Sequence, residues 1–143
     1  MLRALLTGFP VLVLCVALQA LFAGYGMRAY AHFRRDAKHR RFWTQVLTLS
    51  AVMMLVLLGT MLQMGTWALL FVLLGEFDDF ATALYHSAVN FSTLGYGDLV
   101  MSEHWRLLGP LEASNGILMF GVSTAMMTAA VMDILKEARR DAA

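Results

Sequence analysis

Residues 91–98 read FSTLGYGD, a short run with two glycines in a chain that is otherwise mostly apolar. Gly95 and Gly97 lie two residues apart, Thr93 precedes them and Asp98 follows them. In an ordinary strand, successive carbonyl groups point in opposite directions, so a row of carbonyls on one side requires alternating left- and right-handed backbone angles. Glycine reaches the left-handed region without a steric penalty. The spacing of the two glycines therefore suits aligned carbonyl groups, which can replace the water shell of a cation.

The rest of the chain has the composition of a membrane protein. Of its 143 residues, 15% are charged, whereas a typical soluble domain has about 25%. The charges are clustered and leave four uncharged runs, residues 4–27, 42–75, 80–97 and 113–132. A helix needs about 20 apolar residues to cross the hydrocarbon layer. The runs therefore predict an integral membrane protein with up to four membrane segments.

Several functional classes find no support in the sequence. The net charge of +1 does not suggest a nucleic-acid partner. The chain shows no Ser–His–Asp set, no paired carboxylates and no phosphate-binding glycine loop, so we expect no enzyme activity and no cofactor. The first uncharged run is 24 residues long and lacks a clean small-residue cleavage site, which favours a retained membrane helix over a cleaved signal peptide.

The basic residues indicate how the chain crosses the membrane. Of eleven Lys and Arg residues, nine lie in one early loop and in the tail: Arg28, Arg34, Arg35, Lys38, Arg40, Arg41, Lys136, Arg139 and Arg140. The positive-inside rule places both regions in the cytoplasm. The acidic link 76–79 then lies outside, so residues 42–75 and 113–132 cross, and residues 80–97 enter and leave on one side. We expect a multi-pass protein of the cell (inner) membrane with its N-terminus outside and its C-terminus in the cytoplasm.

The run 80–97 differs from a spanning helix in composition and in length. It carries His86, Ser87 and Asn90, and its helical part, 80–92, is about 20 Å long at 1.5 Å per residue. Asp78 or Asp79 can cap this helix. Non-helical backbone at membrane depth is tolerated only where it is buried in protein or lines a water-filled cavity. The predicted fold is an all-α membrane protein with three transmembrane helices, a re-entrant pore helix and a glycine-containing loop.

The segment TLGYGD, Thr93 to Asp98, preceded by a short helix and followed by a span, resembles the pore module of potassium channels, including bacterial ones. The resemblance covers residues 44–135, as an outer helix at 44–74, a pore helix at 80–92, a selectivity filter at 93–98 and an inner helix at 110–135. Residues 1–43 are an additional N-terminal transmembrane helix, at about 5–27, with a basic cytoplasmic loop, and 136–143 form a short cytoplasmic tail. Four such loops surround one pore in that family, so the resemblance implies a homotetramer.

The resemblance also implies roles for individual residues. It assigns K⁺ binding to the carbonyl oxygens of Thr93, Leu94, Gly95 and Tyr96 and to the Thr93 hydroxyl. Gly97 completes the filter, and Asp98 marks the outer mouth. K⁺ is the permeant ion and flows passively, and membrane lipids surround the tetramer.

The chain departs from the family's pattern behind the filter. Leu94 stands where valine is usual, and Val89 stands where some relatives carry a glutamate that bonds the aspartate. The sequence therefore does not predict which group holds Asp98.

Several residues have two interpretations. Gly116 and Gly121, on the last span, are either gating hinges or sites of close helix packing. Asp133 either forms a ring of acids at the inner mouth or pairs with Lys136 one turn on. His86 is either a pH-sensitive neighbour of the filter or a satisfied helix residue.

A further polar pair is expected between the pore helix and the inner helix. Asn90 with Glu112 or Asn115 can form a buried brace there, because polar side chains within a bundle commonly serve packing.

The preferred function is a potassium-selective channel subunit. The alternatives are a weakly selective cation channel and a non-conducting, channel-like membrane subunit. A measurement of selectivity separates the first two, and any ion flux separates both from the third. The stimulus that opens the pore and the role of the first helix are not predicted.

Overall fold

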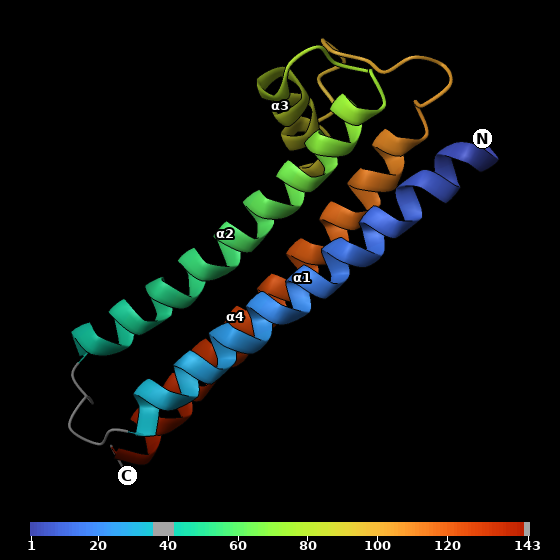
Figure 1. Cartoon of the computed structure of the whole chain (residues 1–143). Helices are drawn as coiled ribbons and strands as arrows, with labels where there is room; N and C mark the ends of the chain where they lie inside the picture. Colours follow the sequence, from blue (N-terminus) through green and yellow to red (C-terminus); the bar gives the residue numbers. More distant parts are fainter. Residues whose placement is uncertain (36–41, 142–143) are drawn as a thin grey trace.

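The structure is a computed structural model that describes residues 1–35 and 42–141. In these residues it contains the helices α1 (Leu2–Arg35), α2 (Phe42–Leu73), α3 (Phe80–Phe91) and α4 (Leu108–Asp141). The three long helices lie side by side, and α3 lies at one end of them together with the loop that follows it (Figure 1). An all-helical fold with three long apolar helices confirms that part of the prediction.

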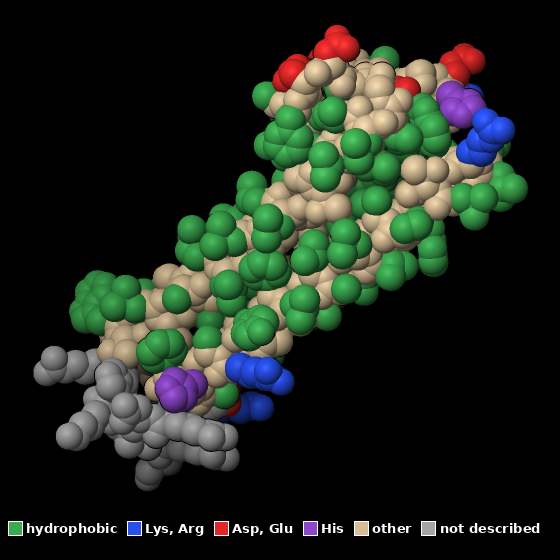
Figure 2. All heavy atoms as spheres, in the orientation of Figure 1, with side chains coloured by type: hydrophobic (Ala, Val, Ile, Leu, Met, Phe, Trp, Pro, Cys, Tyr) green, Lys and Arg blue, Asp and Glu red, His purple; other side chains and the backbone are tan. Residues whose placement is uncertain are grey.

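Each long helix contains a segment that is long and apolar enough to cross a membrane. These segments are Leu2–Phe33, Trp43–Leu73 and Leu108–Lys136. Apolar side chains cover the visible outside of the bundle along its length, and acidic side chains gather at the α3 end (Figure 2). The 12 residues of α3 extend about 18 Å, which is shorter than the hydrocarbon layer of ~30 Å.

The first helix is longer than expected. We expected it to end near residue 27, before a basic loop, but α1 continues to Arg35. Arg28, Arg34 and Arg35 therefore lie on the helix, because arginine is a good helix former and neither glycine nor proline follows Gly26 before that point. Lys38, Arg40 and Arg41 lie outside the described residues.

The last helix also extends past the expected limits of 110–135. It begins at Leu108 and runs to Asp141. Its start places Pro110 in the first turn, where the missing N–H of proline costs nothing. Residues 136–140 read KEARR, all of them good helix formers, so nothing local stops the helix at residue 135.

The short link between α2 and α3 is defined by caps on both sides. Gly75 has a φ of +73°, and the Glu76 N–H donates to the Phe71 carbonyl at 3.1 Å, which closes α2 with a left-handed glycine. Asp79 caps α3, because its Oδ1 accepts from the Thr82 N–H at 2.8 Å and its Oδ2 from the Thr82 hydroxyl at 2.5 Å. The predicted acidic cap is thereby confirmed at Asp79.

The larger of two hydrophobic core clusters lies at the α3 end of the bundle. Trp67 and Phe71 of α2, Phe91 of α3, and Leu108 and Met119 of α4 are fully buried there. The helix α3 packs against both α2 and α4, and α1 packs along the same two helices. The first helix is thus an integral part of the bundle and holds the two helices that support α3.

A buried polar junction joins α1 to α2 and α4. Gln19 Nε2 of α1 donates to the Ser123 hydroxyl of α4 at 3.0 Å, and Gln63 Nε2 of α2 donates to the side-chain oxygen Oε1 of Gln19 at 2.8 Å. Further along, the Tyr30 hydroxyl lies 3.2 Å from the Ala130 carbonyl oxygen. In an apolar bundle such bonds fix the register between helices.

Candidate functional site

The loop that follows α3 has an alternating backbone. Thr93, Gly95 and Gly97 have φ values of +61°, +58° and +75°, while Leu94 and Tyr96 between them are not in the left-handed region. The two glycine angles are those that the sequence led us to expect. The positive φ of Thr93 was not anticipated, because a β-branched residue rarely adopts it.

The amide groups of this loop turn back onto the end of α3. The Thr93 N–H donates to the Asn90 carbonyl at 2.8 Å, and the Leu94 N–H donates to the Val89 carbonyl at 2.9 Å. The Gly95 N–H reaches the same Val89 carbonyl at 3.4 Å. Within the described part of the chain, no hydrogen bond is donated to the backbone carbonyls of residues 93–97. The first three amides of the loop are therefore paired, and its carbonyls are available.

The loop lies at the surface of the single chain. All residues from Thr93 to Asp98 are exposed, including the apolar Leu94 at 57% and Tyr96 at 66%. The apolar side chains of Leu94 and Tyr96 gain nothing from this exposure.

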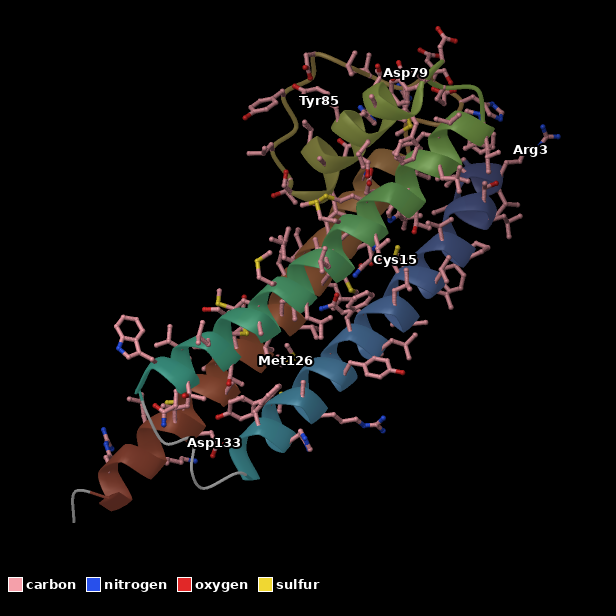
Figure 3. The ribbon with its side chains drawn as sticks, turned by 60° about the vertical axis from the view of Figure 1, so that its left-hand side comes forward. Arg3, Cys15, Asp79, Tyr85, Met126 and Asp133 are labelled. Atoms are coloured by element: carbon pink, nitrogen blue, oxygen red, sulfur yellow. The ribbon has the colours of Figure 1, made fainter. Side chains whose placement is uncertain are left out.

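Asp98 is held by a residue that the sequence did not single out as its partner. The Tyr85 hydroxyl of α3 donates to Asp98 Oδ2 at 2.7 Å. This bond keeps the pKa of Asp98 below its ordinary value and raises that of Tyr85. Tyr85 thus anchors Asp98 from a helix that has Val89 where some relatives carry a glutamate. Tyr85 is labelled on α3, beside the loop, in Figure 3.

His86 has the environment of a packed helix residue. It is 6% exposed, its Nε2 lies 2.8 Å from Asn90 Nδ2, and its ring lies 4.8 Å from that of Phe77. Burial lowers the pKa of His86. Since the Asn90 amide nitrogen can only donate, His86 Nε2 accepts and the imidazole is neutral. These contacts favour the structural interpretation of His86 over the pH-sensitive one.

The helices α3 and α4 approach each other most closely at Gly116. A Cβ atom on Gly116 would lie 1.9 Å from the Phe91 carbonyl oxygen and 2.8 Å from the Phe91 carbonyl carbon. One turn earlier on both helices, Ser87 Oγ lies 2.5 Å from Glu112 Oε1. Ser87 therefore contributes to the brace between the two helices, and Asn90, whose Nδ2 lies 2.8 Å from His86 Nε2, also interacts with the Glu112 carboxyl group.

The two glycines of α4 have different surroundings. A Cβ on Gly121 would meet nothing within 4 Å, in contrast to Gly116. The structure therefore favours close packing as the role of Gly116, whereas none of the described residues requires a small side chain at position 121. Asp133 lies near α1, where the Tyr30 hydroxyl is 3.5 Å from its Oδ2.

A family model described as an ion channel matches residues 56–133, which is more than half of the chain. The chain belongs to this ion channel family. Comparison with the curated proteins and with the solved structures gave no match. The channel is a multi-pass membrane protein, and its matched region contains most of α2, all of α3, the loop and most of α4.

The helix α1 precedes the region that the family model matches. Its contacts with α2 and α4 nevertheless show that the channel folds with α1 in place. Gln19 and Gln63 were visible in the sequence as single amides within apolar runs, and polar residues in membrane helices commonly pair with one another. The bond from Gln19 to Ser123 could not be inferred without the register of the helices.

Proposed function

We propose that this ion channel subunit conducts potassium selectively through a pore formed by four copies of the chain. The observation that carries the proposal is the backbone of residues 93–97, where left-handed angles alternate and the carbonyls receive no hydrogen bond from the described residues. Carbonyl oxygens of Thr93, Leu94, Gly95 and Tyr96, with the Thr93 hydroxyl, would replace the hydration shell of K⁺.

The amides of the loop support this arrangement. Because the N–H groups of Thr93 and Leu94 are bonded to the end of α3, they are directed away from an ion that approaches the carbonyls. The C-terminal end of α3 also carries the partial negative charge of its helix dipole, which favours a cation nearby. In this proposal α3 is a re-entrant pore helix, and Asp98 lies at the outer mouth.

The exposure of the loop supports assembly around an axis. One loop supplies oxygens from one side only, and a dehydrated cation needs ligands on all sides. Four loops around an axis supply them, and neighbouring copies would cover Leu94 and Tyr96, which are 57% and 66% exposed in the single chain. We propose a homotetramer for this reason.

The mechanism is passive. K⁺ ions lose their water at the outer mouth, pass in single file between carbonyl sites and leave into the cytoplasm or the outside, as the electrochemical gradient dictates. In the proposed orientation, the N-terminus lies outside, and the C-terminus and the basic residues near Arg28 lie in the cytoplasm.

An ion-flux assay tests this function. Purified protein in liposomes loaded with K⁺ and diluted into Na⁺ should release K⁺, whereas Gly95→Ala, which forces alanine to a φ of +58°, should abolish the release. Valinomycin added last confirms that the vesicles are intact. Equal release from vesicles loaded with Na⁺ and from vesicles loaded with K⁺ would establish the weakly selective alternative, and no release from a protein confirmed as tetrameric would establish the non-conducting one.

A further inference from the structure

Three helices of the channel meet at the hydroxyl group of Ser87. Ser87 lies on α3 and is fully buried, and its Oγ lies 2.8 Å from the backbone carbonyl oxygen of Met64 on α2. The same Oγ lies 2.5 Å from Glu112 Oε1 on α4. Glu112 is also fully buried, within the segment of α4 that is apolar enough to cross a membrane.

The count of hydrogen atoms at this junction decides which groups donate. A serine hydroxyl has one hydrogen, and a backbone carbonyl oxygen can only accept. If Ser87 donates to Met64, its contact with Glu112 needs a hydrogen from the carboxyl group. If Glu112 were ionised, Ser87 would donate to it, and the Ser87 and Met64 oxygens would face each other at 2.8 Å without a hydrogen between them.

The surroundings of Glu112 contain no positive partner. Ser87 and Asn90 of α3 are its side-chain hydrogen-bond partners, and no Lys or Arg of the described residues forms an ion pair with it. Cys15 of α1 lies near enough to be affected by the charge of Glu112, but a thiol supplies no positive charge. A buried carboxylate without a cation is costly, whereas a neutral carboxylic acid can be satisfied by one donated bond.

We propose that Glu112 is a neutral, hydrogen-donating residue that positions the selectivity filter through Ser87. Its carboxyl O–H donates to the Ser87 hydroxyl, which donates in turn to the Met64 carbonyl. This inference rests on the proposed function, because the segment that is held in place is the proposed filter.

The connection from Ser87 to the filter is short. Ser87 lies one helical turn before Phe91, whose carbonyl group packs against Gly116, one turn beyond Glu112. The last turn of α3 supplies the Val89 and Asn90 carbonyls that accept from the filter amides. A shift of Ser87 relative to α4 therefore moves the Val89 and Asn90 carbonyl groups. These groups set the backbone conformation of Thr93 and Leu94.

Infrared difference spectroscopy tests the protonation of Glu112 without any measurement of current. The spectra of the wild-type protein and of Glu112→Gln are recorded in bilayers at neutral pH and subtracted. The wild type should show the carbonyl band of a protonated carboxylic acid, and the variant should lack it. The matched control Glu103→Gln removes an exposed acid and should remove a carboxylate band instead. Ser87→Ala keeps Glu112 and should shift the acid band to the frequency of an acid with a weaker hydrogen bond. A carboxylate band lost in Glu112→Gln would overturn the proposal.

Single-channel recording tests the positioning role. Glu112→Gln keeps a neutral hydrogen-bond donor, so its open probability, the fraction of time for which the filter conducts, should stay close to that of the wild type. Glu112→Leu has no donor and should lower that fraction about tenfold, as expected for one lost buried hydrogen bond. If Glu112→Gln were as impaired as Glu112→Leu, the neutral-donor role would be wrong. A wild-type channel without current would refute the proposed function, while the infrared result would still decide the state of Glu112.

Discussion

The contact between Gly116 and Phe91 makes the most quantitative prediction about this channel. Gly116→Ala places a Cβ atom 1.9 Å from the Phe91 carbonyl oxygen, whereas ordinary van der Waals contact begins at 3.4 Å. The helices α3 and α4 must therefore separate by about 1.5 Å at this point. The obstacle is backbone at the end of a helix, which cannot rotate away as a side chain can.

The energetic consequence follows from two opposing effects. Overpacking a core typically costs about 1–3 kcal/mol, and the rigid obstacle places this case near the upper limit. Alanine in place of glycine in a helix interior returns about 1 kcal/mol. We expect a net loss of about 2 kcal/mol in the free energy of unfolding, which corresponds to a melting temperature about 4–8 °C lower for a chain of this size.

The assay is thermal unfolding of the purified protein in detergent, followed by circular dichroism. Gly121→Ala is the matched control on the same helix, because its Cβ meets nothing within 4 Å, and it should melt at or above the wild-type temperature. A Gly116→Ala variant as stable as the wild type would refute the account of this contact. If Gly121→Ala is stable but opens rarely, Gly121 serves as the gating hinge.

Three further predictions concern Asp98, the cap of α3 and the first helix. The hydrogen bond from Tyr85 lowers the folded-state pKa of Asp98, so the stabilising effect of this bond is present at neutral pH and is lost as the pH falls through that pKa. Tyr85→Phe should raise the pKa of Asp98, and acid should therefore abolish conduction at a higher pH than in the wild type. Asp79→Ala removes both bonds to Thr82 and should lower the melting temperature, whereas Asp79→Asn, which keeps an oxygen acceptor, should lower it less. Gln19→Leu breaks two interhelical hydrogen bonds worth about 0.6 kcal/mol each. Maleimide labelling of the buried Cys15 on the same helix should therefore become several-fold faster. An unchanged labelling rate would contradict the role of Gln19 in holding α1 against α2 and α4.

The overall architecture was predictable because it depends on patterns that are local in the sequence. Uncharged runs of sufficient length predict the long helices, and an acid before residue 80 predicts the start of α3. The limits of α1 and α4 were less predictable. No glycine or proline stops either helix at the limit that we expected. Both helices therefore continue into charged residues with good helix propensity.

The contacts around the loop were less accessible to sequence analysis. Tyr85 and Asp98 are 13 residues apart, and no periodicity links a helix residue to one in an irregular loop. Ser87 and Glu112 lie on different helices, so their meeting depends on the register that Gly116 permits. The sequence did indicate a polar brace of Asn90 with Glu112 between these helices, but it did not single out Ser87, which shares the Glu112 carboxyl group with Asn90.

The central claim is that the carbonyl groups of residues 93–97 select potassium. The most direct test is the reversal potential of purified protein in a planar bilayer, with potassium on one side and sodium on the other. We predict a reversal close to the potassium equilibrium potential, together with loss of the current in Gly95→Ala. A reversal near zero with a sustained wild-type current would contradict potassium selectivity.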